Sequence, residues 1–161
     1  DVFTPKARVI MIGAVHVAKP LVTLAKSLGY YTIVIDPRTA FATRERFPHV
    51  DELITEWPAD ALNKLHLDEG TYIAALSHDE KLDNPALAVA LASPARYVGA
   101  LGTRKKISNR FAALKELGVT EQQLTRLRAP VGLNLGAISP EEIALSILAE
   151  MVSARHGVLK V

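Results

Sequence analysis

Short apolar runs alternate with amphipathic helical patterns along the whole chain. RVIMI and YTIVI are continuous and rich in branched residues, which is typical of parallel strands buried on both faces. The strands predicted in this way are residues 8–12, 31–35, 52–55, 71–76 and 96–101. The regular alternation of strands and helices predicts an α/β fold: a Rossmann-like open parallel sheet with helices on both faces, in a single domain.

The first helix follows RVIMI directly. Its apolar face is expected to contain Val17, Leu21, Leu24 and Leu28, and Gly29 is expected to end it.

Later helices begin at recognisable caps. Asp83 is expected to cap a helix with Pro85 in its first turn, and Thr103 to cap the helix that follows Gly102. The stretch SPEE at 139–142 predicts a helix start with a capping box. The inward residues expected on the last two helices are Ile107, Phe111, Leu114 and Leu117, then Ile143, Ile147 and Met151.

Composition narrows the possible functions. The net charge of +2 on 161 residues, without a clustered basic face, argues against nucleic-acid binding. No apolar run approaches the roughly 20 residues of a membrane span. The chain contains no cysteine, which excludes disulfides and thiolate chemistry and is compatible with a cytoplasmic protein. The five histidines lack close ligand spacing, so no metal site is predicted. The start at Asp1 rather than Met suggests an excised fragment.

Ligands of open parallel sheets bind beyond the carboxyl ends of the strands, so the loops there are candidate sites. The first loop contains Gly13, Ala14, Val15 and His16, and the helix that follows offers free N–H groups to an anion. Val15 stands where the usual G-x-G-x-x-G/A fingerprint has its second glycine, and its side chain would block close approach of a pyrophosphate. The alternative is a turn that serves packing alone.

Asp36 follows the second strand at about the position where a ribose-binding carboxylate is expected. Arg38, two residues later, could instead reach a phosphate. The alternative for Asp36 is an Asx-type turn before Pro37.

The sequence LGTRKK is the clearest electrostatic signal. Arg104, Lys105 and Lys106 occupy a first helical turn, where each cation opposes the helix dipole at a cost of about 0.3–1 kcal/mol. A bound anion would remove that cost, whereas solvated side chains that bend away would explain the run without a ligand. The other candidate residues at this turn are Gly99, Gly102 and Thr103.

Two more loops carry candidate ligand contacts. His78 and Asp79 follow the strand at 71–76, where the histidine either contacts a ligand or caps the loop. Gly132, Asn134 and Gly136 belong to a glycine-bearing loop that faces a ligand or a partner, or is a structural crossover. No residue is predicted to be catalytic.

The segments IGAVHVAKPL, VIDPR, SHDEKLDNPAL, YVGALGTRKK and PVGLNLGAISPEEIALSILAE together resemble a known family. They are similar to the C-terminal domain of the xanthine dehydrogenase and carbon monoxide dehydrogenase maturation factors, the XdhC/CoxI type. The resemblance covers about residues 8–154, so the domain is assigned to 1–161. The N-terminal domain usual in this family is absent from the chain.

The resemblance implies a cytoplasmic chaperone that binds molybdenum cofactor (molybdopterin) as cargo and has no turnover of its own. It implies an apo xanthine dehydrogenase-type molybdoenzyme as partner, homodimer formation, and a separate sulfur-donating protein. Arg104 and Lys105 would hold the phosphate of the cofactor, while His78, Asp79 and Asn134 would meet the pterin edge.

The alternative is an NAD(P)-binding oxidoreductase domain or a nucleotide-regulated binding module. Gly13, Ala18 and Asp36 motivate it, and Val15 counts against it.

Overall fold

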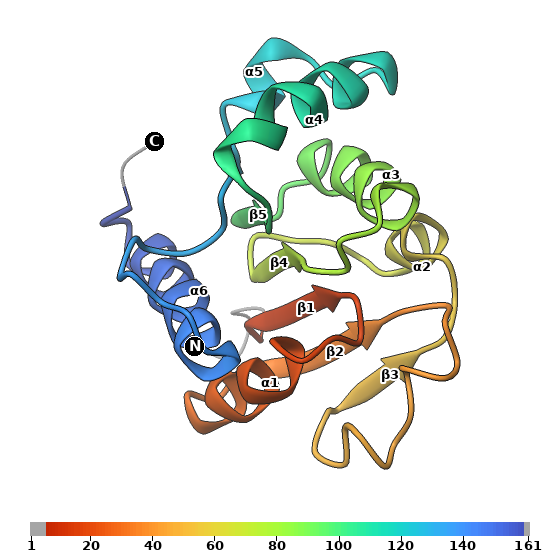
Figure 1. Cartoon of the computed structure of the whole chain (residues 1–161), viewed down its shortest axis with the longest axis vertical. Helices are drawn as coiled ribbons and strands as arrows, with labels where there is room; N and C mark the ends of the chain where they lie inside the picture. The colour runs from red at the N-terminus through yellow and green to blue at the C-terminus, as the bar shows by residue number, and fades with distance from the viewer. Residues whose placement is uncertain (1–5, 160–161) are drawn as a thin grey trace.

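The first apolar run forms β1 (Arg8–Ile12) at the middle of a parallel sheet in the computed structural model, which describes residues 6–159 (Figure 1). The sheet has six strands in the order β3-β2-β1-β4-β5-β6, all parallel. The other strands are β2 (Tyr31–Ile35), β3 (Glu52–Ile54), β4 (Thr71–Ala75), β5 (Tyr97–Ala100) and β6 (Leu127–Arg128). This order is that of a Rossmann fold, and it confirms the predicted fold class.

Two helical layers cover the sheet. α1 (Ala18–Ser27) and α6 (Pro140–Arg155) pack on one face over Val9, Met11 and Val34. The other layer contains α2 (Pro58–Lys64), α3 (Glu80–Leu91), α4 (Arg104–Glu116) and the short α5 (Glu121–Leu124). β1 is fully buried from Val9 to Ile12 because its side chains alternate between the two layers. None of the described helices is long and apolar enough to cross a bilayer.

The predicted start of α3 is wrong. The helix begins at Glu80, and Asp79 is its cap, with a carboxylate that accepts a hydrogen bond from the Lys81 N–H at 2.9 Å. Asp83 is instead a buried residue inside the helix, and Pro85 also lies inside it rather than in the first turn. Both aspartates have local cap chemistry, and the hydrogen bond from Ser77 to Asp83 decides between them.

Two residues predicted to face inward are exposed. Leu28 follows the last residue of α1 and is 52% exposed. Leu117 follows the last residue of α4 and is 51% exposed. α4 packs against α3, so Leu114 is its one fully buried side chain, and Ile107 and Phe111 are half-buried.

The predicted capping box of α6 is confirmed. Ser139 Oγ accepts from the Glu142 N–H at 3.2 Å, and Glu142 Oε1 accepts from the Ser139 N–H at 3.4 Å. Ile147 and Met151 are fully buried as expected, while Ile143 is half-buried at the edge of a cleft.

The caps of α6 and α4 provide a matched pair of substitutions. We expect Ser139→Ala to lower the free energy of unfolding by about 1 kcal/mol, because the Glu142 N–H loses its side-chain acceptor. Thr103→Ala should change it by less than about 0.5 kcal/mol, since the Thr103 side chain makes no cap hydrogen bond. Urea unfolding measures both. Equal losses in the two variants would contradict this account.

Candidate functional site

The loops that follow β1, β4, β5 and β6 meet at one edge of the sheet. The backbone ladder continues beyond the strands there, through Leu76 N to Ile12 O at 2.8 Å, Leu101 N to Ala75 O at 2.9 Å and Val131 N to Ala100 O at 2.9 Å. These bonds hold the loops side by side. The carboxyl edge of the sheet is therefore where the structure brings most of the predicted site residues together.

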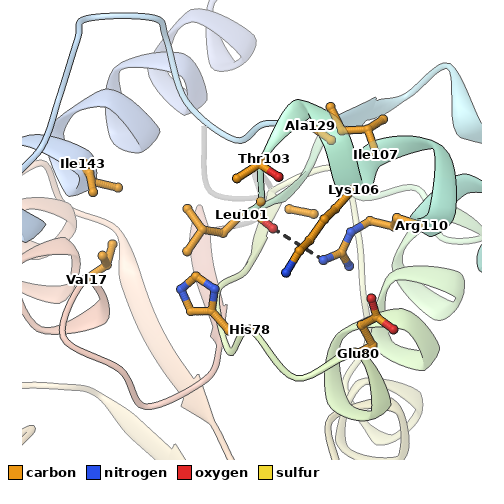
Figure 2. Close-up of a pocket in the computed structure, with 12 residues that line it drawn as sticks. Val17, His78, Glu80, Leu101, Thr103, Lys106, Ile107, Arg110, Ala129 and Ile143 are labelled. Carbon is orange, nitrogen blue, oxygen red and sulfur yellow. Dashed lines mark hydrogen bonds between the residues drawn. The ribbon is translucent and has the colours of Figure 1, made fainter.

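A cleft of about 380 Å³ opens between the β4–α3 turn and the start of α4 (Figure 2). His78, Glu80, Lys106 and Arg110 supply its charged or polar side chains, together with Thr103. Its apolar lining includes Val17, Leu101, Ile107 and Ile143. We call it the α3–α4 cleft.

A second hollow of about 410 Å³ lies beneath the loop at 130–137, and we call it the loop cleft. Arg104 and Asn134 line it, as do Gly132 and Gly136. Leu101 and Ile143 line both clefts, so the two hollows adjoin each other. Lys105 is exposed and lines neither of them.

Three of the predicted glycines are required by the protein's own packing. A Cβ on Gly13 would lie 2.7 Å from Ser77 Cα, and one on Gly99 would lie 2.4 Å from Val131 Cγ2. A Cβ on Gly132 would lie 2.6 Å from Ser146 Oγ. These glycines let neighbouring segments approach closely, which supports the packing interpretation of the first turn.

Gly102 and Gly136 differ from these three. A Cβ on either would meet no atom within 4 Å, and both have positive φ, at +155° and +69°. Gly102 lines the α3–α4 cleft and Gly136 the loop cleft. The space beside these two glycines is open to a ligand.

Asp36 is fully buried. Within residues 6–159, its carboxylate accepts hydrogen bonds from Ala14 and Arg38 alone. Oδ2 accepts from the Ala14 N–H at 2.8 Å and from Arg38 Nη2 at 2.8 Å. Oδ1 accepts from the Arg38 N–H and from Arg38 Nε, both at 2.9 Å. We call this arrangement the Asp36 clasp.

The charge of Asp36 follows from these contacts. Burial acts to raise the pKa of Asp36, but the hydrogen bonds from Arg38 and Ala14 and the positive charge of Arg38 outweigh it and hold the pKa below its usual value. The Asx-type turn considered from the sequence is present, with the added ion pair to Arg38.

The space next to the Asp36 clasp is small. Arg38 lies over the Phe41 ring, with 4.8 Å between its guanidinium carbon and the ring centroid, and Arg46 donates to Ala14 O at 2.7 Å. The remaining hollow of about 110 Å³ is lined by Val15 and His16 together with these groups. Arginine and phenylalanine side chains of the loop after β2 therefore occupy the surroundings of the first turn.

The β4–α3 turn carries His78 in a left-handed conformation, with φ at +66°. It is the one described residue other than glycine with positive φ, and such a conformation costs about 1–3 kcal/mol. Ser77 Oγ accepts from the Asp79 N–H at 3.0 Å and donates to Asp83 Oδ1 at 2.6 Å, which fixes the turn. The imidazole of His78 makes no hydrogen bond within residues 6–159 and points into the α3–α4 cleft (Figure 2).

The start of α4 has unpaired positive charges. Arg104, Lys105 and Lys106 make no ion pair or hydrogen bond through their side chains in the described part of the chain. Exposed Lys64 and Lys115, in contrast, pair with Glu56 and Glu121. The cationic turn predicted from the sequence therefore keeps unpaired charge, with Arg104 at the loop cleft, Lys106 at the α3–α4 cleft and Lys105 outside both.

Glu80, Asn84 and Arg110 at the α3–α4 cleft were missed by the sequence prediction, which named Lys106 only as part of the cationic run. Glu80, Lys106 and Arg110 line it, and Asn84 Oδ1 accepts from Arg110 Nη1 at 2.8 Å. Lys106 and Arg110 are four residues apart and share a helical face, a spacing that is visible in the sequence. The burial of Asn84 depends on α3 packing, which the sequence does not reveal.

The loop at 130–137 is held from below by Glu150 of α6, which is 2% exposed. Glu150 Oε1 accepts from the Gly132 N–H at 3.1 Å and from the Tyr97 hydroxyl, and Oε2 accepts from Arg128 at 3.3 Å. This buried network positions the backbone that leads to Asn134.

Asp83 provides a test of the β4–α3 turn. Burial raises the pKa of Asp83, against the opposing effects of the Ser77 hydrogen bond and the Arg110 charge, and its Oδ2 has no partner within residues 6–159. The folded chain therefore keeps this proton at pH values where the unfolded chain has lost it, so the stabilising effect fades as the pH rises through the raised pKa.

We expect Asp83→Asn, which carries no charge, to gain stability relative to the parent chain as the pH rises above the usual pKa of an aspartate, because burial raises the pKa of Asp83 in the folded chain. Urea unfolding at a series of pH values measures this difference, with Asp60→Asn on the exposed surface of α2 as control. A stability difference that stays constant with pH would contradict a raised pKa for Asp83.

Comparisons with known proteins identify the family to which the chain belongs. A family model described as the XdhC Rossmann domain matches residues 9–151. A probable xanthine dehydrogenase subunit of Bacillus subtilis (strain 168) is 32% identical over 154 residues, which are 96% of this chain and 44% of that protein. The molybdenum cofactor insertion chaperone PaoD of Escherichia coli (strain K12) is 29% identical over 153 residues, 95% of this chain and 42% of that protein.

A solved structure shows the same architecture. The crystal structure of a xanthine dehydrogenase from Bacillus halodurans superposes with a TM-score of 0.82 at 33% identity, and the match covers 98% of this chain and 45% of that one. The chain thus spans less than half the length of these three relatives. The resemblance noted in the sequence motifs is confirmed, and the chain belongs to the family of the XdhC Rossmann domain.

Proposed function

We propose that this chain binds molybdenum cofactor as cargo and is part of a maturation factor for xanthine dehydrogenase-type molybdoenzymes. The observation that carries the proposal is the unpaired cationic start of α4 beside two adjoining clefts. Relatives named as a molybdenum cofactor insertion chaperone and as part of a probable xanthine dehydrogenase support this class of ligand and partner.

The clefts fit the chemistry of molybdopterin, which joins a phosphate to a flat, polar pterin. Each hollow lies in the range of about 300–1,000 Å³ that is usual for small-molecule sites. Arg104, Lys105 and the first-turn N–H groups of α4 would hold the phosphate, since the Thr103 side chain leaves these groups uncapped. The pterin would lie against the apolar lining near Leu101.

The remaining predicted residues take supporting roles. His78 would donate to or accept from the pterin edge in the α3–α4 cleft, and Asn134 would do so from the loop cleft. Asp79 would contribute mainly by fixing the turn, because its carboxylate caps α3. The chain itself would carry out no turnover. A separate protein would donate sulfur, since the sequence has no cysteine, and a homodimer would deliver the cargo to the apoenzyme.

Removal of the two predicted phosphate contacts tests the proposal. Arg104→Ala with Lys105→Ala should weaken molybdopterin binding at least about tenfold, because charge-assisted hydrogen bonds are lost. Retained molybdopterin is measured by fluorescence after oxidation, alongside urea unfolding of the same variant. The control is Lys64→Ala with Lys115→Ala, which removes the same charge from side chains that line neither cleft. Equal binding by the two double variants would refute the phosphate site.

The NAD(P)-binding alternative makes a different prediction. A ribose at the first turn would need the Asp36 carboxylate, whose oxygens already accept from Ala14 and Arg38. We therefore expect the nicotinamide fluorescence of NADH and NADPH to stay unchanged when up to about 100 µM protein is added. This result would mean a dissociation constant above about 100 µM, which corresponds to a binding free energy weaker than roughly 5.5 kcal/mol. Micromolar binding with turnover of a carbonyl substrate would favour the oxidoreductase, and binding without turnover would favour a nucleotide-regulated module.

A further inference from the structure

The α3–α4 cleft has charges of opposite sign on its two walls. Lys106 and Arg110 project from α4, and Glu80 projects from the first residue of α3 (Figure 2). Within residues 6–159, Glu80 forms no ion pair with either cation, although all three side chains line one cleft. The exposed acids Glu56 and Glu121 do pair with nearby lysines. Glu80 is exposed as well, but it lines the cleft, and its carboxylate keeps its acceptor capacity there.

Arg110 also has donors to spare. Its Nη1 donates to Asn84 Oδ1 at 2.8 Å and its Nη2 to Leu101 O at 3.4 Å, the latter a long contact. A guanidinium carries five N–H donors, so further donors remain. The Lys106 ammonium makes no hydrogen bond in the described part of the chain and points into the same space (Figure 2).

The backbone beneath Glu80 is fixed before any ligand arrives. Ser77 is held by Asp79 and Asp83, and the Asp79 carboxylate caps the helix that Glu80 begins. The backbone at Glu80 therefore needs no further ordering when a ligand binds, which favours discrimination between ligands.

The lining between the charged walls is apolar and includes Leu101, Ile107 and Ile143. Such a surface suits a flat ring. The ring should offer N–H donors to Glu80 and an acceptor oxygen to Lys106 and Arg110. A 2-amino-4-oxo pyrimidine ring, as in a pterin, has the ring N–H and the amino group on one edge and the oxygen next to them.

We propose that Glu80 is the specificity-determining residue for the ligand ring. Its carboxylate accepts hydrogen bonds from the ring N–H and the 2-amino group, and Lys106 and Arg110 donate to the 4-oxo oxygen. The assignment rests on the proposed function. It adds which edge of the pterin the chain recognises and which side chains of the α3–α4 cleft contact that edge.

Two fluorescent pteridines test this assignment: pterin, and lumazine, which has an oxygen in place of the 2-amino group. Both are titrated into the whole chain at about pH 6.5, and their own fluorescence reports binding. We expect the parent chain to prefer pterin by about tenfold or more, as for other bidentate polar contacts to a base edge. Glu80→Gln should bring the preference close to one, mainly by weakening pterin binding.

The matched control is Glu121→Gln, which also changes an acid at the first position of a helix but lies outside the cleft. It should keep the preference of the parent chain. Equal binding of pterin and lumazine by the parent chain would overturn the assignment, as would an unchanged preference in Glu80→Gln or a failure of the parent chain to bind either ring at millimolar concentration. None of these results decides the molybdopterin-binding test at Arg104 and Lys105. Failure of the Glu80 assignment and failure of the proposed function can therefore be distinguished.

Discussion

The position of every loop at the candidate site depends on the parallel pairing of β1 with β2 and β4. β1 is buried on both faces, and its last residue, Ile12, is in register with Ile35 of β2 and Ala75 of β4. The three strands therefore end at the same level. The first residues beyond them, including Gly13 and Asp36, are brought side by side by backbone hydrogen bonds, to which the Asp36 carboxylate adds a bond from the Ala14 N–H.

The pairing of β1 with β2 and β4 also determines what the turn after β1 contacts. Gly13 lies against Ser77, and the Ala14 N–H, which could have faced a pyrophosphate, donates to Asp36. The β1–β2 side of the edge is consequently filled by contacts within the chain. Open space and unpaired charge occur instead after β4, β5 and β6, where the clefts lie. In this chain the glycine turn specifies architecture, and the later turns offer the ligand surface.

Much of the fold could be predicted because its signals are local. The five segments predicted as strands are strands, and the SPEE stretch forms a capping box, since each depends on neighbouring residues alone. The start of α3 could not be predicted, because Asp79 and Asp83 both have cap chemistry and a contact with Ser77 decides between them. Leu28 and Leu117 continue an apolar helical pattern past the helix end, where no neighbouring element covers them.

For the candidate site, the sequence by itself determined the cationic start of α4 and the loops that would meet at the sheet edge. The order of charges along a helix and the alternation of strands with helices can both be read from the residues. Only the tertiary structure decided which groups remain available. Asp36 and Arg38 neutralise each other in the clasp, whereas Glu80 and Lys106 stay unpaired in the described cleft. The Asp36–Arg38 pair joins residues two apart in sequence, whereas the separation of Glu80 from Lys106 depends on how α3 and α4 pack together on the sheet.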